Sequence, residues 1–333
     1  MTPRERYLAV LSGGRPDVLP RLPILMQFAA EHIGSHYGLF ASDYRVLVEA
    51  NLRCAEEFGI DQLNTMSDPY RETAGFGAPI EFPRDGVPIC LRPPLEGDPD
   101  VAKLPRPDPL QAPRMRDRIE AVRAYRARAG DRFSIMGWVE GPAAEAADLR
   151  GVSNFFMDLL DDPAYANALM ARCVETAIDF ARPQVAAGAD TIGIGDAVAS
   201  QVSAKVYESL ILPHERRLVA ALHGMNVHVR LHICGNIKHL LHGISTLGLD
   251  IMDIDHMVSL AEARSVLGPK VALAGNVDPV GCVMRGSLDS IAAAVRRCHA
   301  EAGEPFMVNA GCEIPSSTPA ANLAALCRPV APN

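Results

Sequence analysis

The chain has 333 residues, of which 48% are hydrophobic and 22% are charged. Its 32 Lys and Arg residues against 40 Asp and Glu residues give a formal net charge of −8. This composition is typical of a globular protein and excludes disordered, collagen-like and small disulfide-stabilised proteins. An acidic chain also lacks the basic surface that a nucleic-acid-binding protein needs, so we expect no nucleic-acid partner.

The sequence contains no uncharged apolar run of 18 residues, and we therefore expect no membrane span and no membrane partner. The first residues lack the apolar stretch of a signal peptide, which favours a cytoplasmic location. The eight cysteines show no paired spacing, so most are expected to be free, buried thiols. The length suits one barrel of roughly 250 residues with additions, and we expect a single domain over residues 1–333.

The N-terminal part is predicted to be a helical extension, residues 1–60. Thr2-Pro3-Arg4-Glu5 is a capping box with Pro at the first helical position, which predicts a helix over about 3–11. Apolar residues recur at helical spacing between 42 and 58, and Gly59 ends the pattern. Residues 78–109 are rich in Pro, Gly and short β-prone runs, which predicts a β-hairpin and an inserted arm.

Short apolar runs alternate with helical patterns along the rest of the chain. Strands are predicted at 21–26, 62–66, 133–139, 190–194, 227–233, 251–254, 271–274 and 306–309. Helices are predicted at 113–129, 163–187, 203–224, 236–247, 259–267, 287–302 and 319–327. Eight strands alternating with helices indicate an α/β protein and favour a (β/α)₈ TIM barrel over an open doubly wound sheet.

Titratable or metal-binding residues follow nearly every predicted strand, where a barrel of this type carries its active site. These residues include Asp68, Glu140 and Asp196. His232 and Cys234 are two positions apart at the end of a strand, so their side chains should point the same way. If the strand before Cys312 belongs to the same barrel, one imidazole and two thiols converge at its rim.

Two sulfurs and one nitrogen form a ligand set for Zn²⁺, and three protein ligands leave a fourth position for water or substrate. From the spacing alone, however, His-x-Cys is a weak signal, and a small buried core residue is the more ordinary role of a cysteine. The residues by themselves leave the metal site open. No G-x-G-x-x-G loop, P-loop or G-x-S-x-G motif occurs, which disfavours nucleotide binding and serine hydrolase chemistry.

Two segments together carry a resemblance to a known family. They are Leu231-His232-Ile233-Cys234-Gly235-Asn236 and Gly311-Cys312-Glu313-Ile314-Pro315. The pair resembles the uroporphyrinogen decarboxylase superfamily and, within it, the zinc-dependent methyltransferases that act with corrinoid proteins. Gly141-Pro142 and Gly275-Asn276-Val277-Asp278-Pro279 match as well, and the resemblance is strongest over about 133–323.

The resemblance implies that His232, Cys234 and Cys312 bind Zn²⁺. It further implies that a methyl group moves between a small substrate and a methylcobamide carried by a corrinoid protein. Asp68, Glu140 and Asp196 would line the pocket as catalytic groups that orient ligands or handle protons. Glu140 would be the carboxylate that approaches the metal when substrate is absent.

The corrinoid should reside on another chain, because the motif D-x-H-x-x-G is absent here. The hairpin over residues 78–100 is a candidate lid or docking edge for that partner, and a solvated surface arm is the alternative. The sequence leaves open the small molecule that donates or accepts the methyl group, the direction of transfer and the fourth zinc ligand. A homodimer is the default expectation for oligomeric state.

Two other functions remain open. One is a carboxy-lyase similar to uroporphyrinogen decarboxylase, because Asp68 matches the central Asp of those enzymes. Residues 25–32 lack the Arg-rich segment that holds the substrate carboxylates in those enzymes, and the His-x-Cys and Cys312 set also counts against a lyase. The other is a zinc- or ligand-binding protein without catalysis, which the full ligand set disfavours.

Overall fold

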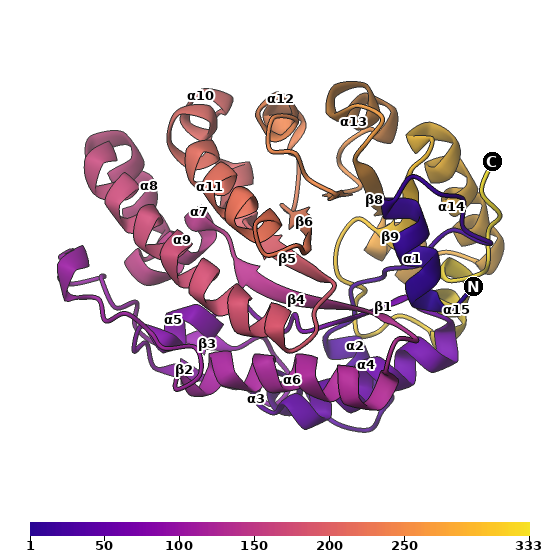
Figure 1. The fold of residues 1–333 in the computed structure, drawn as a ribbon, viewed down its shortest axis with the longest axis horizontal. Coiled ribbons are helices and arrows are strands. Elements are labelled where there is room, and N and C mark those ends of the chain that lie inside the picture. The colour runs from indigo at the N-terminus through magenta and orange to yellow at the C-terminus, as the bar shows by residue number, and fades with distance from the viewer.

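A parallel β-sheet curled into a barrel forms the centre of the structure, a computed structural model that describes residues 1–333 (Figure 1). Its seven strands pair in the order β1-β4-β5-β6-β7-β8-β9, and every neighbouring pair is parallel. They are β1 Gln62–Asn64, β4 Ser134–Glu140, β5 Thr191–Gly195, β6 His228–His232, β7 Ile251–Ile254, β8 Ala272–Val277 and β9 Phe306–Ala310. The barrel predicted from the alternating pattern is therefore confirmed.

The first of the eight predicted strands, at 21–26, is not a regular strand. Prolines just before and within this segment lack the N–H that a sheet ladder requires. The segment still bridges the two edge strands: Leu22 N–H donates to the Val308 carbonyl at 2.8 Å, and Asp61 N–H donates to the Arg21 carbonyl at 2.9 Å. The prediction of eight strands is thus corrected to seven strands and a closing segment in the place of the eighth.

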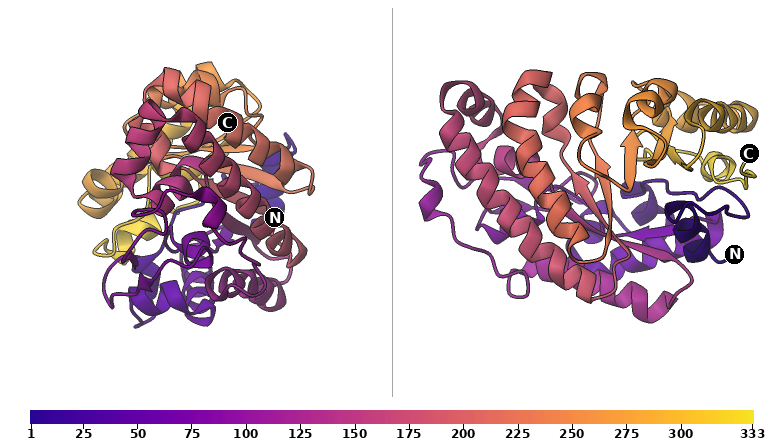
Figure 2. Two further views of the ribbon diagram at one scale, coloured as in Figure 1. Left: turned by 90° about the vertical axis from the view of Figure 1, so that its left-hand side faces the viewer. Right: turned by 45° about the horizontal axis from the view of Figure 1, so that its top comes forward.

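Helices surround the strands, as the two further views show (Figure 2). Beyond the N-terminal extension, the helices of at least seven residues are α6 Pro113–Ala129, α7 Pro142–Arg150, α8 Val152–Asp161, α9 Pro163–Ala186, α11 Leu212–His223, α13 Leu260–Leu267, α14 Leu288–Ala302 and α15 Ala320–Leu326. Most match predicted helices within a few residues. Helix α7 gives no sequence signal because it is buried on nearly all sides and so lacks a one-sided apolar stripe. None of the helices combines the length and the apolar character that crossing a membrane requires.

The N-terminal extension is helical, with α1 Pro3–Leu11, α2 Gln27–His32, α3 Tyr37–Ser42 and α4 Tyr44–Phe58. The capping box forms as predicted, because Thr2 Oγ1 accepts from Glu5 N–H at 3.2 Å and the Glu5 carboxylate accepts from Thr2 N–H at 2.8 Å. The predicted hairpin is present as the antiparallel pair β2 Ile80–Glu81 and β3 Ile89–Cys90.

One buried carboxylate ties the closing segment to the barrel. Asp61 directly precedes β1 and is fully buried. It accepts hydrogen bonds from the backbone N–H and from Nε of Arg21, both at 2.8 Å, and forms an ion pair with Arg6 of α1. A single side chain therefore connects α1, the closing segment and β1.

Asp61→Ala is expected to lower the free energy of unfolding by about 3–5 kcal/mol, because the buried Arg21 guanidinium loses its carboxylate partner and Arg6 keeps only Asp17. Urea-induced unfolding followed by circular dichroism measures this change. The control Glu56→Ala breaks the half-exposed pair with Arg132 and should cost no more than about 1 kcal/mol. Equal small losses in the two variants would contradict the role of Asp61.

Candidate metal centre and active site

The structure brings His232, Cys234 and Cys312 together at the carboxyl end of the barrel. His232 ends β6, Cys234 lies two residues beyond it, and Cys312 lies two residues beyond the end of β9. Cys234 Sγ is 3.1 Å from His232 Nε2 and 3.7 Å from Cys312 Sγ. Cys312 Sγ is 4.0 Å from His232 Nε2, so the three donor atoms surround one point.

These separations fit a zinc ion. With Zn–S bonds of about 2.3 Å and a Zn–N bond of about 2.0 Å, tetrahedral geometry separates two sulfurs by about 3.8 Å and a sulfur from a nitrogen by about 3.5 Å. The sulfur–sulfur distance of 3.7 Å agrees, and the two sulfur–nitrogen distances, 3.1 and 4.0 Å, bracket the second value. The group contains three protein donors, which leaves one tetrahedral position for water or substrate.

A carboxylate behind His232 fixes the orientation of its ring. Asp253 in β7 lies with Oδ2 2.9 Å from His232 Nδ1, and Arg230 Nε donates to both Asp253 oxygens at 3.0 Å. Burial acts to raise the pKa of Asp253, but Arg230 and His232 lower it overall. The ionised carboxylate accepts a hydrogen bond from Nδ1, so Nε2, which faces the two sulfurs, is the nitrogen available to a metal ion.

The two thiols are poised so that one of them ionises easily. A hydrogen bond from Cys234 lowers the pKa of Cys312 to about 4, with burial opposing and His232 assisting. The thiolate is the form of cysteine that binds metal ions. Cys312 is therefore the thiol most ready to bind a metal ion, whereas the hydrogen bond with Cys312 and burial raise the pKa of Cys234.

His232, Cys234 and Cys312, together called the donor group, lie in the wall of a cavity of about 200 Å³. Val87, in the loop between β2 and β3, lines it, so the inserted arm reaches the mouth of the barrel. Trp138, the single tryptophan of the chain, lies in its wall with its ring centroid 6.4 Å from that of His232. The indole fits because β5 carries glycines beside it: a Cβ on Gly193 would lie 2.3 Å from the ring.

Asp68, predicted to be in the pocket, lines this cavity. Ser67 Oγ donates to its Oδ2 at 2.6 Å, Tyr70 N–H donates to its Oδ1 at 3.0 Å, and Arg114 forms an ion pair with it. Burial acts to raise the pKa of Asp68, but Arg114 and Arg71 lower it to about 2. The carboxylate is therefore ionised and fully engaged by neighbouring donors.

Glu140 also lines the cavity. Trp138 Nε1 donates to its Oε1 at 3.1 Å, and the buried Arg71 forms an ion pair with the same oxygen. Burial, assisted by Glu72, raises the pKa of Glu140 to about 8, although Arg71 acts in the opposite direction. The donor group around His232 does not include Glu140, so its approach to a bound metal stays a prediction.

Asp196 lies elsewhere, and the expectation that it lines the pocket does not hold. Its carboxylate is fully buried and accepts from the N–H of Ala144 at 2.7 Å in the first turn of α7. A helix N-terminus attracts a carboxylate in this way. Glu215 lies on its other side and accepts a hydrogen bond from Tyr207 Oη. Asp196 therefore fastens α7 to the barrel instead of facing the cavity.

Sequence reasoning missed Arg71, Asp253 and Glu313. Asp253 could have been found from the sequence, because it lies inside an otherwise apolar strand. A charged residue in such a strand is rarely buried without a partner. Arg230, which pairs with it, lies two positions before His232 and so on the same strand face. Arg71 lies in a short helix after β1 and Glu313 in the loop after β9, where no periodic pattern fixes the direction of a side chain.

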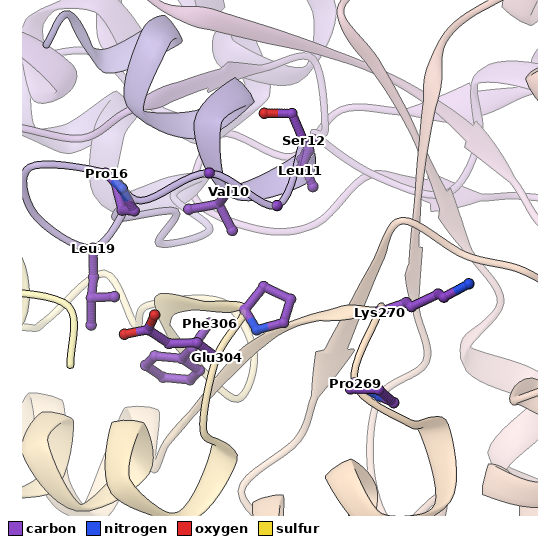
Figure 3. Close-up of a pocket in the computed structure, with 12 residues that line it drawn as sticks. Val10, Leu11, Ser12, Pro16, Leu19, Pro269, Lys270, Glu304 and Phe306 are labelled. Atoms are coloured by element: carbon purple, nitrogen blue, oxygen red, sulfur yellow. The ribbon is translucent and has the colours of Figure 1, made fainter.

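A larger cavity, about 520 Å³, lies at the opposite end of the barrel (Figure 3). Its wall combines the loop after α1 with the residues that lead into β8 and β9. The Glu304 carboxylate in this wall is already engaged by His299 Nε2 at 3.1 Å and by the backbone N–H of Asn333 at 2.7 Å. No cysteine or histidine lines it, so the cavity at the carboxyl end is the candidate active site.

Comparison with known proteins adds to this geometry. The family model for uroporphyrinogen decarboxylase (URO-D) matches residues 2–331. Methylcobamide:CoM methyltransferase MtaA from Methanosarcina barkeri is 28% identical over 98% of this chain and 96% of its own length. A uroporphyrinogen decarboxylase from Gloeobacter violaceus is 26% identical over 94% of each chain. Methyltransferases and decarboxylases are thus about equally similar in sequence.

Among solved structures, a methyltransferase from Methanosarcina mazei superimposes with a TM-score of 0.90. The match covers 98% of this chain and 97% of that one at 24% sequence identity. At this level of identity the likeness bears on the fold alone, and it agrees with the curled parallel sheet described above.

The pair of buried carboxyl groups at α7 predicts a measurable pH dependence of stability. Burial raises the pKa of Glu215 to about 7, against about 4.3 in an unfolded chain. The folded protein therefore binds more protons than the unfolded chain, and this contribution to stability is lost as the pH rises from about 4.3 to about 7.

In Glu215→Gln this titration disappears. The free energy of unfolding of the variant, relative to wild type, should therefore rise by about 1–3 kcal/mol between these pH values. Urea unfolding at several pH values measures the difference. Glu208→Gln, at an exposed position in the helical segment just before α11, should show a constant offset, and an equally constant offset for Glu215→Gln would contradict the prediction.

Proposed function

The chain belongs to the uroporphyrinogen decarboxylase (URO-D) family, and from this premise we propose that it is a zinc-dependent methyltransferase. It moves a methyl group between a small substrate and a corrinoid carried by a partner protein. The observation that supports this proposal most is the meeting of His232, Cys234 and Cys312 at tetrahedral separations with one position open. Relatives named methylcobamide:CoM methyltransferases, 26–28% identical, support the corrinoid partner.

In this proposal each group at the site has a separate task. His232, Cys234 and Cys312 hold Zn²⁺, which when bound acts as a Lewis acid and lowers the pKa of a coordinated thiol or water. Asp253 holds the imidazole in the tautomer that binds metal. Trp138 and the apolar wall around it exclude water from the reacting methyl group.

Glu140 is the group best suited to exchange a proton with the substrate. Its pKa of about 8 lies close to neutral pH, where a general acid or base works most efficiently. Trp138 and Arg71 hold the carboxyl in the cavity wall. Asp68 stays ionised and keeps Arg114 in place, so we assign it a positioning task.

The same cavity counts against the decarboxylase alternative. Uroporphyrinogen carries eight carboxylates, and each one that is buried needs a cationic partner. Arg71 and Arg114, the two arginines behind the cavity wall, already pair with Glu140 and Asp68.

Metal analysis tests the ligand set directly. The purified chain, loaded with zinc and passed over a desalting column, should retain about one zinc per chain, the content that a single three-ligand site predicts. Cys234→Ala and Cys312→Ala should lose it, because two protein donors do not form the site. The control Cys298→Ala removes a buried thiol outside the donor group and should keep the metal. Unchanged zinc in Cys234→Ala would refute the assignment.

The transfer itself is tested with methylcobalamin in place of the corrinoid protein. The zinc-loaded chain should demethylate it in the presence of an acceptor thiol, and loss of the alkyl-cobalt absorbance measures the rate. Cys312→Ala should lose this activity, whereas Cys298→Ala should keep it. Decarboxylation of uroporphyrinogen by a chain that leaves methylcobalamin intact would instead establish the alternative.

A further inference from the structure

We infer that the small substrate of this cavity is an uncharged, largely apolar molecule about the size of a substituted benzene ring, and not an anion. The inference rests on the proposed function, and it names the substrate class for that site. Three observations support it. The walls of the cavity are mainly hydrophobic, the nearby arginines already form ion pairs, and the three ligands with bound zinc have no net charge.

The walls of the cavity are mainly hydrophobic. A cavity of about 150 Å³ lined by aliphatic and aromatic side chains is large enough for benzene. The cavity here, about 200 Å³, has room for a ring with a small substituent. The apolar part of its wall is formed by Ile24, Met26, Tyr37, Met66, Val87 and Trp138.

No cation is free to receive an anionic group. None of the 15 residues that line the cavity is Lys or Arg. Arg71, just behind the wall, is fully buried and pairs with Glu140 and Glu72. Arg114 pairs with Asp68. An anion in the cavity would have to take one of these arginines from its carboxylate and leave that carboxylate buried without a partner, which is costly.

The donor group supplies no net positive charge either. Zn²⁺ with two thiolates and a neutral imidazole has a formal charge of zero, so the occupied site does not attract an anion through its total charge. The remaining charged or titratable groups in the wall are acidic: the carboxyls of Asp68, Glu140 and Glu313 all line the cavity. Glu313 Oε1 accepts from the backbone N–H of Gln27 at 3.3 Å and has no arginine beside it. These groups disfavour an anion and tolerate a neutral molecule.

The fluorescence of Trp138 offers a direct binding assay, because this single tryptophan lies in the cavity wall. Two matched pairs of probes separate charge from size. The first is 2-methoxyphenol against 2-methoxybenzoate, and the second is 2-mercaptoethanol against 2-mercaptoethanesulfonate. Each is titrated at pH 7 into the zinc-loaded and the zinc-free chain.

The neutral member of each pair should bind at least about tenfold more tightly than the anionic member, which corresponds to about 1.4 kcal/mol. Equal or tighter binding of the anions would overturn the inference, and so would the absence of any fluorescence change with both neutral probes. If the chain holds zinc and demethylates methylcobalamin but prefers the sulfonate thiol, this inference fails and the proposed function stands. If no zinc is retained, the proposed function fails whatever the probes show.

A charge variant gives a second test. Asp68→Asn removes the ionised carboxylate that neutralises Arg114, so the preference for the neutral probe at pH 7 should shrink by about tenfold or more. The control Asp85→Asn makes the same change in net charge at an exposed position on the arm and should leave the preference unchanged. A preference that shrinks equally in both variants, or in neither, would contradict the role given to the Arg114–Asp68 pair.

Discussion

The hydrogen bond between Asp253 and His232 Nδ1 is the contact on which the site depends. It fixes the imidazole with Nε2 toward Cys234 and Cys312, and without that orientation the three donors do not share a point. Asp253 can hold the ring because Arg230 neutralises it within the barrel. A buried polar network, which continues from Asp253 through Arg230 to Gln62, thus supports His232 inside the barrel.

A second constraint is the balance of buried charge around the cavity. The arginines closest to it, Arg71 and Arg114, are committed to carboxylates that belong to the protein. These ion pairs stabilise the polar part of the cavity wall, and they leave neither arginine available to bind an anionic ligand. Because these arginines are already paired, the cavity disfavours a substrate with many carboxylates and favours a neutral one. The same ion pairs therefore argue against decarboxylation of uroporphyrinogen and for a neutral methyl donor or acceptor.

Much of this could be predicted from the sequence. Strand alternation places His232 and Cys234 on one face, and a closed barrel brings Cys312 to them. Asp196 follows a strand, as active-site residues of a barrel do, but this position predicts where the backbone lies and not where the side chain points. The first turn of α7 attracts the Asp196 carboxylate away from the cavity. Arg71 was missed because its contacts arise only in the folded chain. The predicted strand at 21–26 is irregular because prolines interrupt its hydrogen bonding.

The central claim is that two sulfurs and one imidazole nitrogen surround a single zinc ion with one position open. X-ray absorption at the zinc edge of the metal-loaded chain measures this coordination directly. The account predicts two sulfurs at about 2.3 Å, one imidazole nitrogen at about 2.0 Å and one further ligand that changes from a light atom to sulfur when a thiol is added. A shell of oxygen and nitrogen alone, or four protein ligands unaffected by thiol, would contradict it.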